Sequence, residues 1–135
     1  MTVNCVWEHN GNDTMLHAVD YPGAFTRGES LETAVGKMPR EITSYLKWCG
    51  GPIDDDIKIT IVQEKSSDLD IKDADSDVLF QREKEPLTKE SYERLRDLAL
   101  KSAKDFLALY ESVPDKNAVA IAQRKTFYGQ APRSA

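Results

Sequence analysis

The sequence predicts an α+β protein. A small antiparallel sheet, in the order strand-strand-strand-helix-strand, is followed by an acidic linker and a long C-terminal helix. Apolar residues alternate with polar ones near the N-terminus and again over residues 57–63, which is the period of a strand with one buried face. Apolar residues recur at three- and four-residue spacing over residues 31–46 and again over residues 92–113, and this spacing predicts two helices.

The composition is that of one soluble domain, or of a small domain with an appendage. The 135 residues are 30% charged, and Lys+Arg 18 against Asp+Glu 23 give a net charge of −5, which argues against a dedicated nucleic-acid binder. No apolar run approaches the roughly 18 residues of a membrane span, and the N-terminus does not resemble a signal peptide. We therefore expect a cytoplasmic protein without membrane contact, in which Cys5 and Cys49 are buried thiols rather than a disulfide.

The charge is unevenly distributed along the chain. Residues 1–63 and residues 64–86 each carry a net charge of −4, whereas residues 87–135 carry +3. We interpret 64–86 as a solvated acidic linker between an α/β domain (1–63) and a helical segment (87–135), because it contains few large apolar residues. Its aspartates are candidate residues for binding a basic partner: Asp68, Asp70, Asp73, Asp75 and Asp77.

The first strand and its turn have the clearest local signals. Val3, Cys5 and Trp7 alternate with Asn4, Val6 and Glu8, as in a strand with one buried face. The turn sequence at 10–13 contains Gly11, which tolerates a positive φ. A second strand follows over 15–20, and a Pro-Gly pair separates it from a short third strand at 24–27.

Ser30 is the expected N-cap of the first helix, and Gly50 is its expected left-handed C-cap. Pro39 lies within the helix and lacks a backbone N–H, so we expect either a kink or two helical segments. Val62 interrupts the alternation of the strand at 57–63, which indicates a bulge or a strand end.

Residues 20–34 resemble the signature of the HicB-like family, in which Asp-x-Pro-Gly precedes a short strand and Gly-x-Ser-Leu-x-x-Ala opens a helix. The resemblance covers about residues 3–63 and implies a small α/β fold. Gly23 and Gly28 are expected to allow unusual backbone angles. The residues that carry the motif are Asp20, Pro22, Gly23, Gly28, Ser30, Leu31 and Ala34.

The second helix is expected to begin after Thr88 and to end before Pro114. At about 24 residues it would be roughly 36 Å long, more than a small sheet can cover. Part of its apolar side is therefore expected to pack on something other than the sheet, such as the same helix of a second copy. The apolar side consists of Tyr92, Leu95, Leu98, Ala99, Ser102, Phe106, Leu109, Tyr110 and Val113.

A weaker resemblance covers Leu95 to Ala135, which is similar to the opening of a DinB-like four-helix bundle. It predicts that the last five residues form the first turn of another helix. DinB-like proteins bind a divalent metal through three histidines, but this chain has two, His9 and His17, and both fall in the predicted first hairpin. They could face each other there, although ordinary surface or core histidines are the simpler interpretation.

Other chemical signals are weak. Neither aspartate register in the acidic stretch has the spacing of a calcium loop, and neither Cys5 nor Cys49 has a histidine close in sequence. No glycine-rich phosphate loop is present. A small basic and aromatic cluster could contact nucleic acid, but packing on the long helix is the simpler interpretation; its members are Arg124, Lys125, Phe127, Tyr128 and Arg133.

We therefore expect a non-catalytic binding module, without metal or cofactor, that associates with a protein partner. Many HicB-like proteins are antitoxins that mask a small basic ribonuclease, and the acidic balance of this chain would suit such a partner. The alternative is an accessory or truncated N-terminal part of a DinB-like metal-dependent enzyme, whose catalytic histidines would lie beyond Ala135.

Overall fold

The computed structural model of the chain describes residues 1–118, 121–126 and 129–133. The chain forms two compact units, Met1–Pro86 and Leu87–Ala135. The first unit contains a four-stranded sheet, the helix α1 (Leu31–Cys49) and two short 3₁₀ turns, η1 (Ile71–Asp73) and η2 (Gln81–Lys84). The second contains the helix α2 (Lys89–Ser112) and a hairpin of β5 (Ile121–Thr126) and β6 (Gly129–Arg133).

The sheet has the strand order β3-β2-β1-β4. Its strands are β1 (Thr2–Asn10), β2 (Asp13–Ala18), β3 (Phe25–Gly28) and β4 (Lys58–Ser66). The predicted α+β class and the order of elements are confirmed. The sheet is mixed rather than wholly antiparallel, because β4 pairs in parallel with β1. The chain crosses the sheet through α1 and enters β4 from the end where β1 begins, so that the Lys58 N–H donates to the Met1 carbonyl (2.9 Å).

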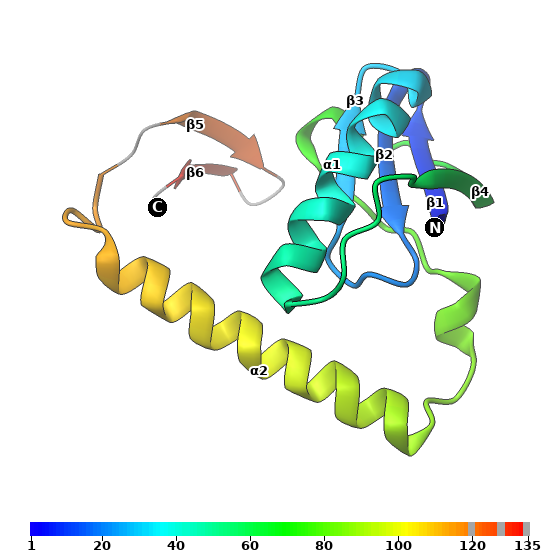
Figure 1. Ribbon diagram of the computed structural model, residues 1–135. Helices are drawn as coiled ribbons and strands as arrows, with labels where there is room; N and C mark the ends of the chain where they lie inside the picture. Colours follow the sequence, from blue (N-terminus) through cyan, green and yellow to red (C-terminus); the bar gives the residue numbers. More distant parts are fainter. Residues whose placement is uncertain (119–120, 127–128, 134–135) are drawn as a thin grey trace. The chain divides into compact units, whose positions relative to one another are not determined.

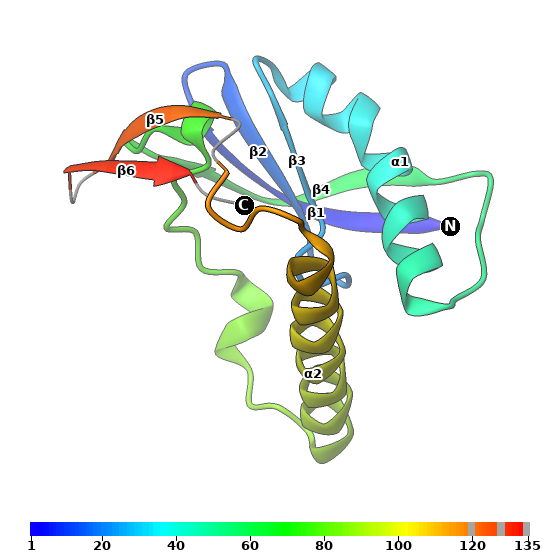
Figure 2. The ribbon, with the colours of Figure 1, turned by 90° about the vertical axis from the view of Figure 1, so that its left-hand side faces the viewer.

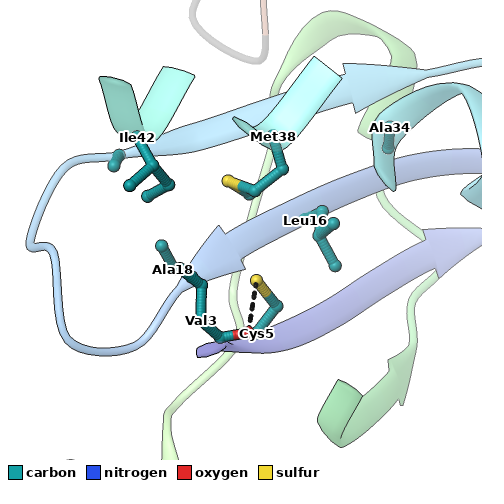
Figure 3. Packing of buried hydrophobic residues seen from close by; sticks show 8 residues of the cluster. Val3, Cys5, Leu16, Ala18, Ala34, Met38 and Ile42 are labelled. Carbon is teal, nitrogen blue, oxygen red and sulfur yellow. Dashed lines mark hydrogen bonds between the residues drawn. The ribbon is translucent and has the colours of Figure 1, made fainter. Parts of the chain in front are cut away.

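The helix α1 packs across one face of the sheet, and the hydrophobic core lies between them (Figure 1). The close view in Figure 3 shows side chains of β1, β2 and α1 pointing into this layer. The buried members of the cluster are Val3, Cys5, Leu16, Ala18, Ala24, Ala34, Met38 and Ile42.

The local signals for α1 are confirmed at both ends. The Ser30 hydroxyl accepts a hydrogen bond from the Thr33 N–H (3.2 Å), and Gly50 takes the left-handed conformation with φ 72°. Pro39 lies inside one continuous helix, so the two-segment alternative is not realised. The Thr43 hydroxyl donates to the Pro39 carbonyl (2.9 Å), which gives that oxygen a side-chain partner.

The bulge indicated by Val62 is present in β4. Ile61 pairs with Cys5 and Gln63 pairs with Val6, so Val62 is the extra residue. The strand continues to Ser66, three residues beyond the predicted end, and residues 64–66 are therefore part of the sheet rather than of a linker.

The chain after β4 returns over the second face of the sheet. Figure 2 shows α1 on one side of the sheet and this segment, in green, on the other. We call residues 67–85 the returning segment. Ile71 within it is 1% exposed and Ser67 is also buried. The interpretation of this stretch as solvated is therefore wrong at Ser67 and Ile71.

In the second unit, α2 begins at the predicted cap, where the Thr88 hydroxyl accepts from the Ser91 N–H (3.1 Å). The predicted helical turn at the C-terminus is wrong for residues 131–133, which belong to β6; residues 134–135 lie outside the described part of the chain. A hairpin thus stands where the DinB-like resemblance implies a second helix.

Candidate functional site

The most unusual polar group in the first unit is the carboxyl group of Glu8, which is 0% exposed. Pairing of β1 with β2 puts Glu8 opposite Met15, and puts Val6 opposite His17, on the face of the sheet that the returning segment covers. Burial of a carboxyl group is costly unless its oxygens are hydrogen-bonded, so its partners decide what it does.

Three polar groups contact the carboxyl group of Glu8. The Ser76 hydroxyl donates to Oε2 (2.6 Å), the Asp77 backbone N–H donates to Oε1 (3.0 Å), and Nε2 of His17 lies 3.2 Å from Oε2. Two of these groups come from the returning segment and one comes from β2. Glu8 therefore fastens the returning segment to the sheet.

This arrangement differs from a nucleophile-base pair. In a catalytic triad the serine hydroxyl donates to the histidine, which in turn donates to the acid. Here the serine and the histidine both contact the same carboxyl group, so this geometry does not prepare Ser76 for attack. The cluster satisfies a buried acid and holds two parts of the chain together.

Further contacts surround the cluster. Lys65 on β4 pairs with the Asp77 carboxylate (2.7 Å), and its hydrogen bond lowers the pKa of that carboxyl group below its usual range. His17 lies between two aromatic rings, with centroid distances of 6.2 Å to Phe25 and 5.6 Å to Phe80. The Gln63 side chain donates to the Leu79 carbonyl (3.0 Å) and accepts from the Gln81 N–H (2.9 Å).

Sequence reasoning missed this cluster because it assigned one buried face to each strand. A signal was present: Val6 and Met15 are apolar at positions that alternation places on the supposedly polar face, and both are buried. Apolar residues on both faces of β1 indicate a sheet that is covered on both sides.

The two histidines do not form a site together. The register puts His17 opposite Val6, whereas His9 lies opposite Thr14 on the other face. His9 stacks on Trp7 (4.3 Å between centroids), and its Nε2 contacts the Glu64 carboxylate (3.0 Å). Among the described residues, its Nδ1 is the buried side-chain polar atom without a hydrogen-bond partner.

The cysteines are both free, and only one matches the expectation of a buried thiol. Cys5 is buried, and burial raises its pKa to about 11, so it is a protonated thiol near neutral pH rather than a nucleophile. Cys49 is exposed, because it ends α1 just before the Gly50 cap.

The five predicted partner-binding aspartates divide by environment. Asp68 and Asp70 are exposed on the returning segment. Asp73 is partly buried, and both it and Asp75 have interactions within the chain. The Asp77 carboxylate is paired with Lys65. Within the part of the chain that the structure describes, no group of three or more His, Cys, Asp or Glu side chains could hold a metal ion.

The motif residues at 20–34 have structural roles. Pro22 and Gly23 lie in the turn before β3, and Gly23 has φ 90°. Gly28 is required for space rather than for a positive φ, because an added Cβ would lie 2.8 Å from the Ala34 nitrogen. Asp20 pairs with Arg82 of the returning segment. Leu31 and Ala34 pack in the core.

The second candidate surface is the apolar side of α2. None of its residues is buried. Tyr92 is 55% exposed, Phe106 67% and Leu109 64%. Leu100 and Leu107 are similarly exposed, and Tyr110 is 38% exposed. An apolar stripe exposed along a helix makes α2 a candidate protein-interaction surface.

The basic and aromatic cluster can be placed only in part. Arg124 and Lys125 lie in β5 and Arg133 lies in β6, whereas Phe127 and Tyr128 are outside the described residues.

No protein-family model, no curated protein and no solved structure matches the chain. The HicB-like and DinB-like resemblances therefore stay predictions. Of the helices in the described ranges, none has the length and apolar character needed to cross a membrane.

Proposed function

We propose that this protein is a non-catalytic binding module that acts by associating with other protein chains. The observation that carries this proposal is α2, a helix of 24 residues with an apolar stripe and no buried residue. In a soluble domain such a helix normally buries its stripe, because exposed apolar area is unfavourable in water.

The charge of the first unit supports a basic partner. Residues 1–86 contain seventeen Asp and Glu against nine Lys and Arg, a net charge of −8. Opposite charge speeds association and selects partners more than it adds affinity. Together with the HicB-like motif, this balance favours an antitoxin-like role in which the acidic unit binds a small basic protein, such as a ribonuclease toxin.

A non-catalytic role agrees with the chemistry of the candidate groups. Ser76 and His17 are both used to satisfy Glu8, and burial keeps Cys5 protonated. The polar clusters of the first unit thus serve to hold the fold together.

The test is to recover the tagged protein from its native cells and to read the intact masses of the bound species. We expect a stoichiometric protein partner. A basic partner on the acidic unit should dissociate in high salt, whereas a partner on α2 should be lost in Phe106→Asp and retained in Ala108→Asp, which adds the same charge away from the stripe. If the protein is recovered alone and monomeric under all conditions, the proposal is wrong.

A further inference from the structure

We propose that α2 pairs with α2 of a second copy of this chain, as an antiparallel two-stranded coiled coil whose twofold axis passes between Leu100 and Lys101. This inference rests on the proposed function, since it names the occupant of the same apolar surface. Four observations support it: the spacing of the stripe, the sizes of its side chains, its charges and its area.

The stripe repeats every seven residues over the whole helix. Counting from Tyr92, apolar or small residues recur at alternating intervals of three and four residues: Tyr92, Leu95, Ala99, Ser102, Phe106, Leu109 and Val113. A strict seven-residue repeat drifts by about 20° per heptad relative to a straight helix, so two such helices follow each other by supercoiling to the left. A partner helix with the same repeat keeps the seam in contact along its length.

The side-chain sizes fit an antiparallel partner. In this register Tyr92 faces Leu109 of the second copy, Leu95 faces Phe106, and Ala99 faces Ser102. The layers of Tyr92, Leu95, Phe106 and Leu109 then each combine an aromatic ring with a leucine, and the two central layers are small and allow close approach of the backbones. A parallel pair in register would instead set Phe106 against Phe106 and Tyr92 against Tyr92.

The charges beside the seam are compatible with the same orientation. Asp105 pairs with Lys101 of its own helix (2.6 Å), and Arg94 lies on the outer side of the helix, so neither is used across the seam. Arg96 then lies near Ala103 rather than near a like charge. The two helix dipoles also oppose each other, which is favourable.

The seam exposes apolar area that a second copy would cover. Three aromatic side chains per helix, Tyr92, Phe106 and Tyr110, are 38–67% exposed and offer roughly 300 Å². Leu109, which is 64% exposed, and the partly exposed Leu95 and Leu98 add to this area.

The first test is the mass of the full chain in solution, by light scattering or sedimentation equilibrium over a range of concentrations. We expect about twice the chain mass of 15.2 kDa. Phe106→Asp should return the mass to that of a monomer, and the matched variant Ala108→Asp should leave the dimer intact. A wild-type monomer, or a dimer unaffected by Phe106→Asp, would overturn the inference.

The second test is orientation. In a Cys49→Ser background, which removes the exposed thiol, spin labels are attached at Lys89→Cys in one sample and at Lys104→Cys in another. The antiparallel register separates the two Lys89 positions by about 35 Å along the axis and the two Lys104 positions by about 10 Å. Short distances at both sites would mean a parallel pair and would contradict the register.

A monomer that still recovers a partner from native cells would overturn this inference alone and leave the proposed function standing.

Discussion

At the scale of single residues, Glu8 has the most consequences for the first unit. Its carboxyl group is fully buried, accepts hydrogen bonds from the returning segment and contacts His17 of the sheet. A buried group of this kind contributes little net stability when it is satisfied, but its removal leaves buried donors without partners. Its main effect is therefore to fix where residues 76 and 77 lie.

We expect Glu8→Ala to destabilise the first unit by about 3 kcal/mol, because it removes the acceptor of the Ser76 hydroxyl and the Asp77 N–H and the partner of His17. Glu8→Gln keeps the shape and one acceptor oxygen, so its cost should be smaller, about 1–2 kcal/mol. Urea denaturation measures both. The control is Glu64→Gln, since the Glu64 side chain is 58% exposed and its pairing with His9 should contribute less than about 1 kcal/mol. Equal losses in Glu8→Ala and Glu64→Gln would contradict this account.

At the scale of elements, α1 shows how local and tertiary requirements act together. Its ends are fixed by Ser30 and Gly50, while its apolar side is fixed by the sheet beneath it. Thr26 of β3 connects the two, because its buried hydroxyl donates to the Ala34 carbonyl (2.8 Å). The absence of a side chain at Gly28 permits this close approach of strand and helix.

Ser30→Ala should destabilise the first unit by about 1 kcal/mol, because the Thr33 N–H loses its acceptor at the start of α1. The shift is read from the chemical denaturation midpoint. Thr88→Ala is the matched control: it removes the same kind of cap from α2, in the other unit, and should leave the unfolding of the first unit unchanged. If Thr88→Ala shifts the unfolding midpoint of the first unit by more than Ser30→Ala does, the two units unfold together.

At the scale of the whole molecule, the chain divides into Met1–Pro86 and Leu87–Ala135, and these two units differ in the side chains that they bury. The first unit has a buried core on one face of its sheet and the Glu8 cluster with Ile71 on the other. The second presents a helix without buried residues. We therefore expect the first unit to fold by itself.

A chain ending at Pro86 should fold and unfold cooperatively with the stability of the first unit in the full protein, and it should be monomeric. Circular dichroism during urea titration and light scattering measure these properties. A chain ending at Ser66 should be much less stable, because it lacks Ile71 and two of the donors to Glu8. If the two truncations are equally stable, the returning segment contributes nothing to the fold.

Local chemistry made much of this protein readable from its sequence. Alternation located β1 and β4, Ser30 and Thr88 located the starts of α1 and α2, Gly50 located an end, and the break at Val62 located the bulge, because each of these depends on neighbours within a few residues. The hairpin of β5 and β6 was not predicted. The heptad spacing of α2 is likewise a property of the sequence alone.

Only the tertiary structure decided which residues distant in sequence meet. It set β4 parallel to β1, placed His9 and His17 on opposite faces, and brought Ser76 and Asp77 to Glu8 across almost seventy residues of chain. The acidic composition of residues 67–85 did not indicate that this segment would pack on the sheet. A polar segment needs only a few buried side chains, such as Ile71, and a few hydrogen bonds to be held on a matching surface. That surface forms only when the sheet does, and this is why the second covered face could not be derived from local pattern.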